Sequence, residues 1–203
     1  MTITTYAELQ TAIADWIGNR ASAATRVKDF ITMFEAQFSR DMRTGDQFKN
    51  GTFTPGVDGA VTLPADLAGI DAVTVNSGGE EVDLTPAPIR YAKRVRPSSG
   101  VTPRFFYIQA GKLFTIPIGP GNVTIHYYAK LPTLTDAAPT NWLLTGHPDV
   151  YLYGSLLNAA PFIQDAEMLA FWGTASQGAM ASLTLSDTDR WANAQMRVVG
   201  VTP

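Results

Sequence analysis

Hydrophobic residues repeat with two different periods along this chain, and the change between them constrains the fold more than any other feature. Apolar side chains recur at helical spacing in residues 1–45 and again after Trp142. Between Asp46 and about Pro132 lie most of the glycines and prolines, which separate short β-branched and aromatic runs typical of strands and turns. Strands between two helical ends predict an α+β fold: a discontinuous α-helical bundle with an inserted all-β sandwich or barrel domain.

The first 45 residues predict two amphipathic helices that form an antiparallel hairpin. Thr5 and Glu8 fit a capping box at the start of the first helix, and Gly18-Asn19 supplies its stop. The second helix is expected to start near Thr25 and to be ended by Gly45. Its apolar stripe consists of Val27, Phe30, Ile31, Phe34, Phe38 and Met42, with Arg26, Glu35, Gln37 and Arg40 off the stripe.

In the middle region the clearest unit spans 104–116, where Ala110-Gly111 separates two apolar runs and predicts a hairpin. The next strand is expected over 122–129, because apolar and polar residues alternate there. Shorter strands are expected over 61–63, 70–75 and 81–84. The resulting boundaries are a helical domain of 1–45 and 135–187, a β insertion domain of 46–134, and a C-terminal tail of 188–203.

Helical periodicity returns near Pro148 and Asp149, two residues that suit the first turn of a helix. Residues 150–160 are apolar on nearly every side, which predicts a buried helix that Pro161 ends. A longer helix is expected from near Gln164. Its apolar face would hold Met168, Leu169, Trp172, Ala175, Ala179 and Leu183.

Composition narrows the chemistry open to the chain. It has 203 residues, no cysteine and two histidines, so disulfides, thiolate metal sites and cysteine nucleophiles are excluded and no cofactor or metal is expected. A formal net charge of −3 argues against a dedicated nucleic-acid-binding protein. No signal peptide and no membrane-length apolar run are recognised, so synthesis in the cytoplasm and no membrane partner are expected.

The two histidines are candidates for a catalytic or metal-binding role. His147 precedes Pro148 and Asp149 and could act as a general base, but a helix start explains all three residues of the triplet. His126 lies in the middle of a predicted strand, where a surface or hydrogen-bonded histidine is favoured over a metal ligand.

Three further motifs also favour structural roles. Gly154-Ser155 lacks the second glycine of a nucleophile elbow and lies within a predicted helix. Gly119-Pro120-Gly121 is typical of a turn, because no Gly-Lys-Ser/Thr follows it. Glu80 and Glu81 are adjacent on a strand and therefore point to opposite faces. No catalytic residue is predicted.

One charge cluster stands apart from these motifs. A third of all basic residues fall within fifteen positions, at Arg90, Lys93, Arg94, Arg96 and Arg104. This basic patch is either a solvated loop or a surface that meets a phosphate backbone or an acidic partner.

The aromatic residues after Pro148 repeat mostly at helical spacing and are expected in the core. A helix that is apolar on every side exceeds what one thin helical layer can cover, so part of it is expected to pack against a neighbouring subunit. The candidates for subunit packing are Tyr151, Tyr153, Phe162 and Trp172.

Several segments, read in order, resemble the head-to-tail adaptor (connector) proteins of tailed bacteriophages. The opening TYAELQTAIADWIGNR with VKDFITMFEAQFSRDMR is similar to the N-terminal helix pair of that family. An LPADL stretch (63–67), a Pro-x-x-Tyr strand with a Gly-x-Leu hairpin (103–113) and a Tyr-Tyr-Ala strand follow. The segments TIHYYAKLPTLTDAAPTNW and NWLLTGHPDVYLYGSLLNAAPF continue the resemblance to about Trp172.

This resemblance implies a structural virion protein of the phage neck, similar in plan to the podovirus tail tubular A proteins. Its subunits would form a ring, a dodecamer by analogy, that joins the portal protein to a tail or nozzle protein. Genomic DNA would pass through the central channel without sequence-specific binding. The same analogy makes the C-terminal segment the candidate for portal contact, through Trp191, Met196, Arg197, Val198 and Val199.

Two other functions remain open at this point. A tail-associated peptidoglycan hydrolase would need two acidic residues that face one cleft, and no convincing pair stands out in the sequence. A β module that binds carbohydrate or protein at the tail surface would place the function within residues 46–134.

Overall fold

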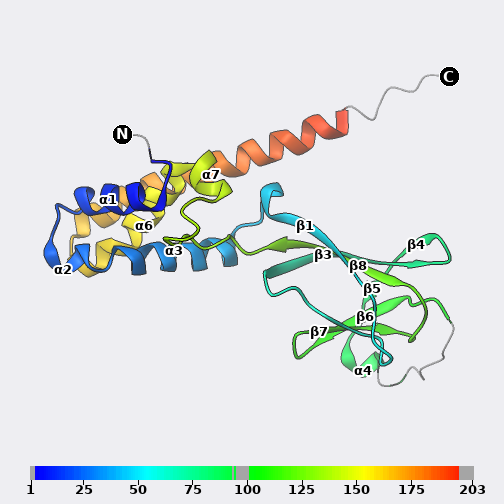
Figure 1. The fold of residues 1–203 in the computed structure, drawn as a ribbon. Helices are drawn as coiled ribbons and strands as arrows, with labels where there is room; N and C mark the ends of the chain where they lie inside the picture. The colour runs from blue at the N-terminus through cyan, green and yellow to red at the C-terminus, as the bar shows by residue number, and fades with distance from the viewer. Residues whose placement is uncertain (1–2, 93, 95–100, 197–203) are drawn as a thin grey trace. The chain divides into compact units, whose positions relative to one another are not determined.

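The computed structural model covers 203 residues and describes residues 3–92, 94 and 101–196. The chain divides into two compact units, which Figure 1 shows as a ribbon. The helical unit comprises Met1–Asp46 and Leu131–Pro203, and the β unit comprises Gln47–Lys130. Helices from both chain ends therefore enclose a continuous stretch of strands in the sequence, which confirms the predicted α+β fold with a β insertion.

The helices of the helical unit come from both ends of the chain. They are α1 (Tyr6–Trp16), α2 (Ala21–Ala24), α3 (Val27–Asp41), α5 (Trp142–Gly146), α6 (Pro148–Ile163) and α7 (Ala166–Met196). The capping box at the start of α1 is confirmed: Thr5 Oγ1 accepts from the Glu8 amide at 3.3 Å, and Glu8 Oε2 accepts from the Thr5 amide at 3.0 Å. The short helix α2 was not predicted, because its four residues are too few to show a periodic pattern.

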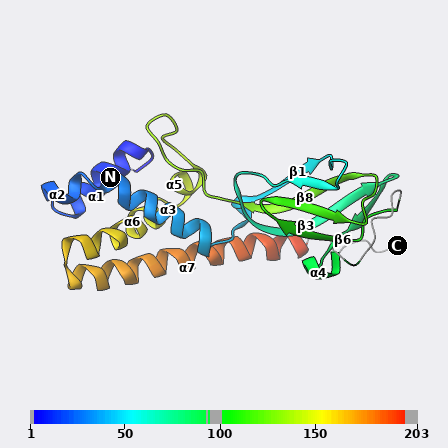
Figure 2. The ribbon, with the colours of Figure 1, turned by 90° about the horizontal axis from the view of Figure 1, so that it is seen from below.

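Helix α6 is the centre of the helical core. It packs against α1, α3 and α7, and in Figures 1 and 2 it runs among them. The predicted burial of this helix is confirmed for Val150, Tyr151, Leu152, Gly154, Ser155, Leu156, Ala159 and Ala160. The prediction that Pro161 ends the helix is wrong. Its ring is compatible with helical φ, and α6 continues to Ile163 and stops at Gln164, whose φ of 56° is left-handed.

Helix α7 is longer than the sequence pattern suggested and continues to Met196, through the first part of the segment assigned to a tail. It packs along α6 through Trp172, Ala179 and Leu183, three members of the predicted apolar face. In the C-terminal half of α7, the two carboxylate oxygens of Asp187 accept hydrogen bonds from the Gly45 amide, at 2.9 Å for Oδ1 and 3.1 Å for Oδ2. Arg190 forms an ion pair with Asp46 at 3.0 Å. These contacts join α7 to the segment where the chain leaves the helical unit.

The β unit consists, in its described residues, of two four-stranded sheets that share one core. One sheet has the order β1-β8-β3-β4 and the other β2-β7-β6-β5. Their bounds are β1 Phe48–Phe53, β2 Ala60–Thr62, β3 Leu67–Ser77, β4 Glu80–Asp83, β5 Thr85–Pro86, β6 Phe105–Gln109, β7 Lys112–Ile116 and β8 Asn122–Ala129. Side chains from both sheets, among them Val75, Phe106 and Ile125, lie in the common core, so the unit is a β sandwich.

The hairpin and the strand predicted most clearly are both confirmed. Ala110 and Gly111 connect β6 to β7 with φ values of 49° and 71°, the left-handed pair that a tight two-residue hairpin turn requires. In β8 the residues Val123, Ile125 and Tyr127 are buried while their neighbours are less so. Strand β8 is central to its sheet, because it pairs antiparallel with both β1 and β3.

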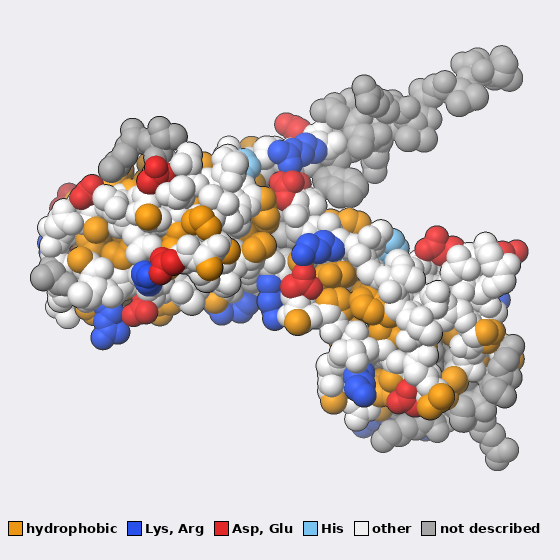
Figure 3. Space-filling model, viewed as in Figure 1, with side chains coloured by type: hydrophobic (Ala, Val, Ile, Leu, Met, Phe, Trp, Pro, Cys, Tyr) orange, Lys and Arg blue, Asp and Glu red, His pale blue; other side chains and the backbone are white. Residues whose placement is uncertain are grey.

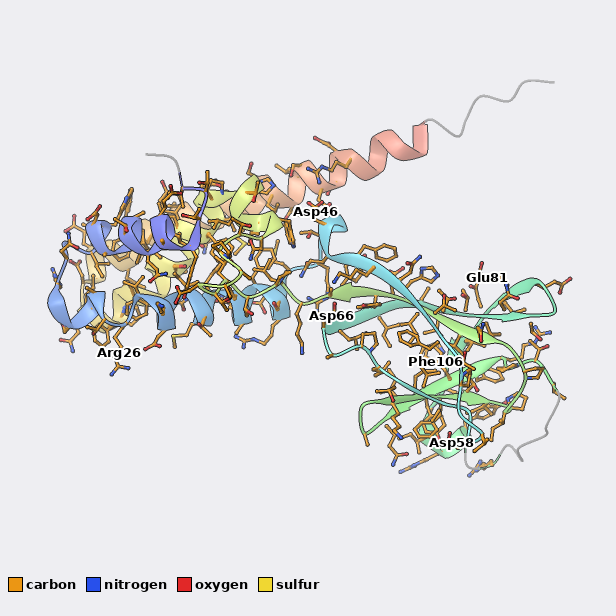
Figure 4. The ribbon with its side chains drawn as sticks, in the orientation of Figure 1. Arg26, Asp46, Asp58, Asp66, Glu81 and Phe106 are labelled. Carbon is orange, nitrogen blue, oxygen red and sulfur yellow. The ribbon has the colours of Figure 1, made fainter. Side chains whose placement is uncertain are left out.

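The LPADL stretch leads into β3, which begins at its last residue, Leu67. It is tied to the neighbouring strands through Asp66, which Figure 4 labels. The Asp66 carboxylate accepts from Lys49 Nζ at 2.8 Å and from the Tyr127 hydroxyl at 3.2 Å. Lys49 holds the pKa of Asp66 below its usual range, mainly through this hydrogen bond. Because its pKa is lowered, this carboxylate stays charged at ordinary pH and secures the loop between β2 and β3 to the sheet.

Candidate interaction surfaces

The residues considered for catalysis occupy structural positions. Ser155 is fully buried inside α6, where a substrate cannot reach its hydroxyl. His147 takes the N-cap position of α6, as expected for a helix start, but its side chain makes no capping hydrogen bond. The His126 ring stacks on Phe48 at 6.2 Å between centroids. Glu81 accepts from the Thr74 hydroxyl at 2.6 Å on the β3–β4 hairpin.

Two other kinds of feature, a metal-binding cluster and a membrane-spanning helix, are absent from the described residues. No group of three or more His, Asp or Glu side chains within residues 3–92, 94 and 101–196 could hold a metal ion. No helix in the same part of the chain is long and apolar enough to cross a membrane.

One acidic residue, Glu35, is buried at only 3% exposure, although its position off the apolar stripe of its helix predicted no such burial. Its Oε1 accepts from the Leu134 amide and from the Tyr151 hydroxyl, both at 2.8 Å. Asn141 Nδ2 in turn donates to the Tyr151 hydroxyl at 2.8 Å. Burial raises the pKa of Glu35, while its two hydrogen bonds act in the opposite direction. With both donors satisfied, Glu35 holds the segment before α5 against α3.

An open groove lies where the end of α1 meets the start of α7. We name it the α1/α7 groove. It is lined by Asp15, Trp16, Glu167, Met168, Phe171 and Trp172 and has a volume of about 540 Å³. The Phe171 side chain is 55% exposed. Trp172 is 1% exposed, and its indole N–H has no hydrogen-bond partner. The groove therefore combines an apolar floor with two carboxylates.

The apolar face predicted for α7 is only partly correct for this reason. Met168 and Leu169, which were placed on this apolar face together with Trp172, are 39% and 41% exposed. Helix α7 extends beyond the core in its first turns, so the same helical stripe that is buried from Trp172 onward is open to solvent before it.

A second apolar groove lies on α3 and α6. This α3/α6 groove is lined by Arg26, Asp29, Phe30, Met33, Asn158, Pro161 and Phe162. Figure 3 shows one face of the helical unit, where hydrophobic side chains gather among the charged ones, and Figure 4 shows Arg26 directed outward. Phe162 is 45% exposed and packs against Phe30 at 5.7 Å. A lone subunit therefore leaves large apolar side chains in water at two separate places.

The four residues expected at subunit contacts differ in their surroundings. Tyr151 and Trp172 are buried within the subunit, at 0% and 1% exposure. Tyr153 is half-buried and packs edge-on against Trp16 at 5.9 Å. Only Phe162 among the four is exposed to a large extent. It is therefore the one of the four that remains a candidate for a contact with a neighbouring subunit.

The basic patch lies at a short helix of the β unit, α4 (Ile89–Ala92). Arg90, Arg94 and Arg104 are exposed, and none of the ion pairs between described residues includes them. The Tyr91 ring packs edge-on against Phe105 at 5.2 Å and fixes α4 beside β6. Lys93 and Arg96 lie outside the described residues.

The candidates for portal contact lie at the C-terminal end. The backbone of Trp191 and Met196 continues α7. Arg197, Val198 and Val199 lie outside the described residues.

The fold and these surfaces define an α+β protein with an inserted β sandwich and a helical unit with exposed apolar grooves. Residues 4–199 match the family model described as SU10 adaptor protein. The chain belongs to this family of phage head-to-tail adaptors, which confirms the resemblance found in the sequence. It is accordingly a structural adaptor protein of a bacteriophage. No curated protein matched the chain in sequence.

Proposed function

We propose that the protein forms a ring in the phage neck, a dodecamer by analogy, that joins the portal protein to the tail and continues the DNA channel. It acts there without catalysis of its own. The observation that carries this proposal is the pair of apolar grooves at two separate places on the helical unit, which share no lining residue. A ring needs two unlike surfaces on each subunit, because every subunit contacts one neighbour with each.

The charge of the chain suits a channel. Strong phosphate binding would slow a sliding DNA molecule, and the net charge of −3 avoids a uniformly basic lining. DNA would pass without sequence-specific contacts. The virion neck would then be the site of the protein, after its synthesis in the host cytoplasm.

The test is assembly on the portal. The purified protein is expected to be monomeric or weakly associated alone, and to form rings once the portal protein is added, as seen by electron microscopy and native mass spectrometry. Phe162→Asp would place a charge on the α3/α6 groove and is expected to weaken ring formation about tenfold or more. Arg40→Asp on the exposed surface of α3 serves as the control. If the Phe162→Asp variant forms rings as stable as those of the wild-type protein, the α3/α6 groove is not part of the subunit interface.

Removal of residues 188–203 is expected to abolish portal binding, since the C-terminal segment is the proposed portal contact. The truncated chain keeps Asp187 and its bonds to Gly45 but loses the exposed Arg190–Asp46 ion pair, whose loss costs less than about 1 kcal/mol. Its melting temperature should therefore stay near that of the intact chain. Arg190→Ala is the matched control and should bind portal normally. Undiminished portal binding by the truncated chain would refute this role.

A further inference from the structure

We infer that the α1/α7 groove of one subunit binds the α4 region of the β unit of the next copy. The α4 region is defined by Ile89, Arg90, Tyr91 and Arg94. This inference rests on the proposed ring and names a pair of surfaces that would build it. It also assigns an acidic partner, rather than DNA, to the basic patch.

The first argument is charge. The groove carries Asp15 and Glu167 on its walls, and none of the ion pairs between described residues involves either one. Arg90 and Arg94 on the α4 region are likewise exposed and without an ion pair in the same set. Asp15 accepts a hydrogen bond from Asn19 Nδ2 at 3.1 Å, but its charge, like those of Glu167, Arg90 and Arg94, is not balanced by any of these ion pairs. Two carboxylates and two guanidinium groups of this kind complement one another between subunits.

The second argument is the apolar component of both surfaces. Ile89 and Tyr91, on either side of Arg90 in α4, are 38% and 44% exposed. A site that binds DNA phosphates requires cationic and hydrogen-bonding groups, and an exposed isoleucine makes no favourable contact with a phosphate. The groove offers a matching floor of Trp16, Met168 and Phe171.

The third argument is the nature of the aromatic floor. An arginine that enters the groove can lie over the face of Trp16 or Phe171, where the ring quadrupole attracts a cation. A segment that carries both guanidinium groups and an aromatic ring therefore suits the two carboxylates and the rings of the groove together.

The contact is heterologous, because the groove and the α4 region are different surfaces of the chain. Each subunit would therefore use its groove on one neighbour and its α4 region on the other, as a closed ring requires.

Reciprocal charge reversal in the full-length protein tests the pairing. The patch variant is Arg90→Glu with Arg94→Glu, and the groove variant is Asp15→Lys with Glu167→Lys. Each is expected to weaken ring formation on the portal about tenfold or more, measured by native mass spectrometry at low salt. An equimolar mixture, and a single chain with all four changes, should assemble to within about threefold of the wild-type protein, because both restore opposite charges at the contact.

Controls separate this inference from the proposed function. Arg40→Glu with Lys112→Glu reverses the same amount of charge on α3 and β7 and should leave assembly unchanged. Circular dichroism melting should show all variants folded. If wild-type rings form but neither the mixture nor the fourfold variant recovers them, the α1/α7 groove does not bind the α4 region. The proposed ring is not affected by that result. If the wild-type protein forms no ring with portal, the proposed function itself fails.

A DNA-binding measurement decides between the two meanings of the basic patch. Binding of a short double-stranded DNA, followed by fluorescence anisotropy, should be weak and equal for the wild-type and patch variants. A patch variant that loses DNA binding but assembles normally would overturn the inference and assign the arginines to phosphate.

Discussion

Replacement of Gly154 by alanine is expected to destabilise the helical unit by about 1–3 kcal/mol, the usual cost of overpacking a core. An added Cβ would meet the Phe34 ring at Cδ2 and Cε2 inside contact distance. The Phe34 ring has little room to move, because Phe34 is 1% exposed and packs between two other rings. Its centroid lies 5.9 Å from that of Phe38 and 5.0 Å from that of Tyr151. The close approach of α6 to α3 therefore depends on glycine at this position.

Gly178→Ala in α7 is the matched control, because the same substitution there should have the opposite sign. A Cβ at Gly178 would meet no atom within 4 Å. Alanine is favoured over glycine in an open helix by about 0.8–1 kcal/mol, so this variant should be slightly more stable. Urea unfolding of both variants, followed by circular dichroism, gives the two free energies.

A double-mutant cycle assigns the loss to the Phe34 ring. In a Phe34→Leu background the smaller side chain leaves room, so Gly154→Ala should cost less than it does in the wild-type chain. An equal cost in both backgrounds would show that the clash with Phe34 is not the cause.

The sequence predicted burial correctly where the pattern of apolar residues along a single helix or strand determines which of its faces is buried. Strand β8 alternates strictly and lies between two neighbours, so its buried residues follow from its pattern. Helix α6 is apolar on all sides and occupies the centre of the helical unit. The capping box of α1 is likewise a local signal, because both of its hydrogen bonds lie within four residues.

Predictions failed where the outcome depended on partners distant in the sequence. Met168 belongs to the same helical stripe as Trp172, but Met168 is 39% exposed in the α1/α7 groove whereas Trp172 is 1% exposed. The two grooves also join residues from separate helices, such as Trp16 with Phe171, and so have no local signature. For Glu35 a signal did exist: it lies four residues after Ile31 and beside Phe34, at the edge of the buried stripe.

The buried carboxyl group of Glu35 should make the stability of the helical unit depend on pH. Burial raises its pKa, so the folded state binds the proton more tightly than the unfolded state, whose value is near 4.5. The stabilisation from this proton is present below pH 4.5 and is lost as the pH rises through the raised value. Wild-type protein should therefore lose unfolding free energy over this range.

Glu35→Gln should remove this dependence. The amide Oε1 can still accept from the Leu134 amide and the Tyr151 hydroxyl, but it has no charge to desolvate. The difference in unfolding free energy, variant minus wild type, should therefore become more favourable as the pH rises from 4.5 to 8. Urea unfolding at several pH values measures it, and a difference that stays constant over this range would contradict a raised pKa.

Two comparisons exclude other origins for this pH effect. Asp66 in the β unit has a lowered pKa, so its stabilisation is lost only as the pH falls below its ordinary value of 3.8, outside the measured window. Glu35→Ala leaves the donors at Leu134 and Tyr151 buried without an acceptor and should cost about 3 kcal/mol. Because that cost comes from lost hydrogen bonds, it should be large at pH 4.5 as well. The glutamine and alanine variants thus separate the charge of Glu35 from its role as an acceptor.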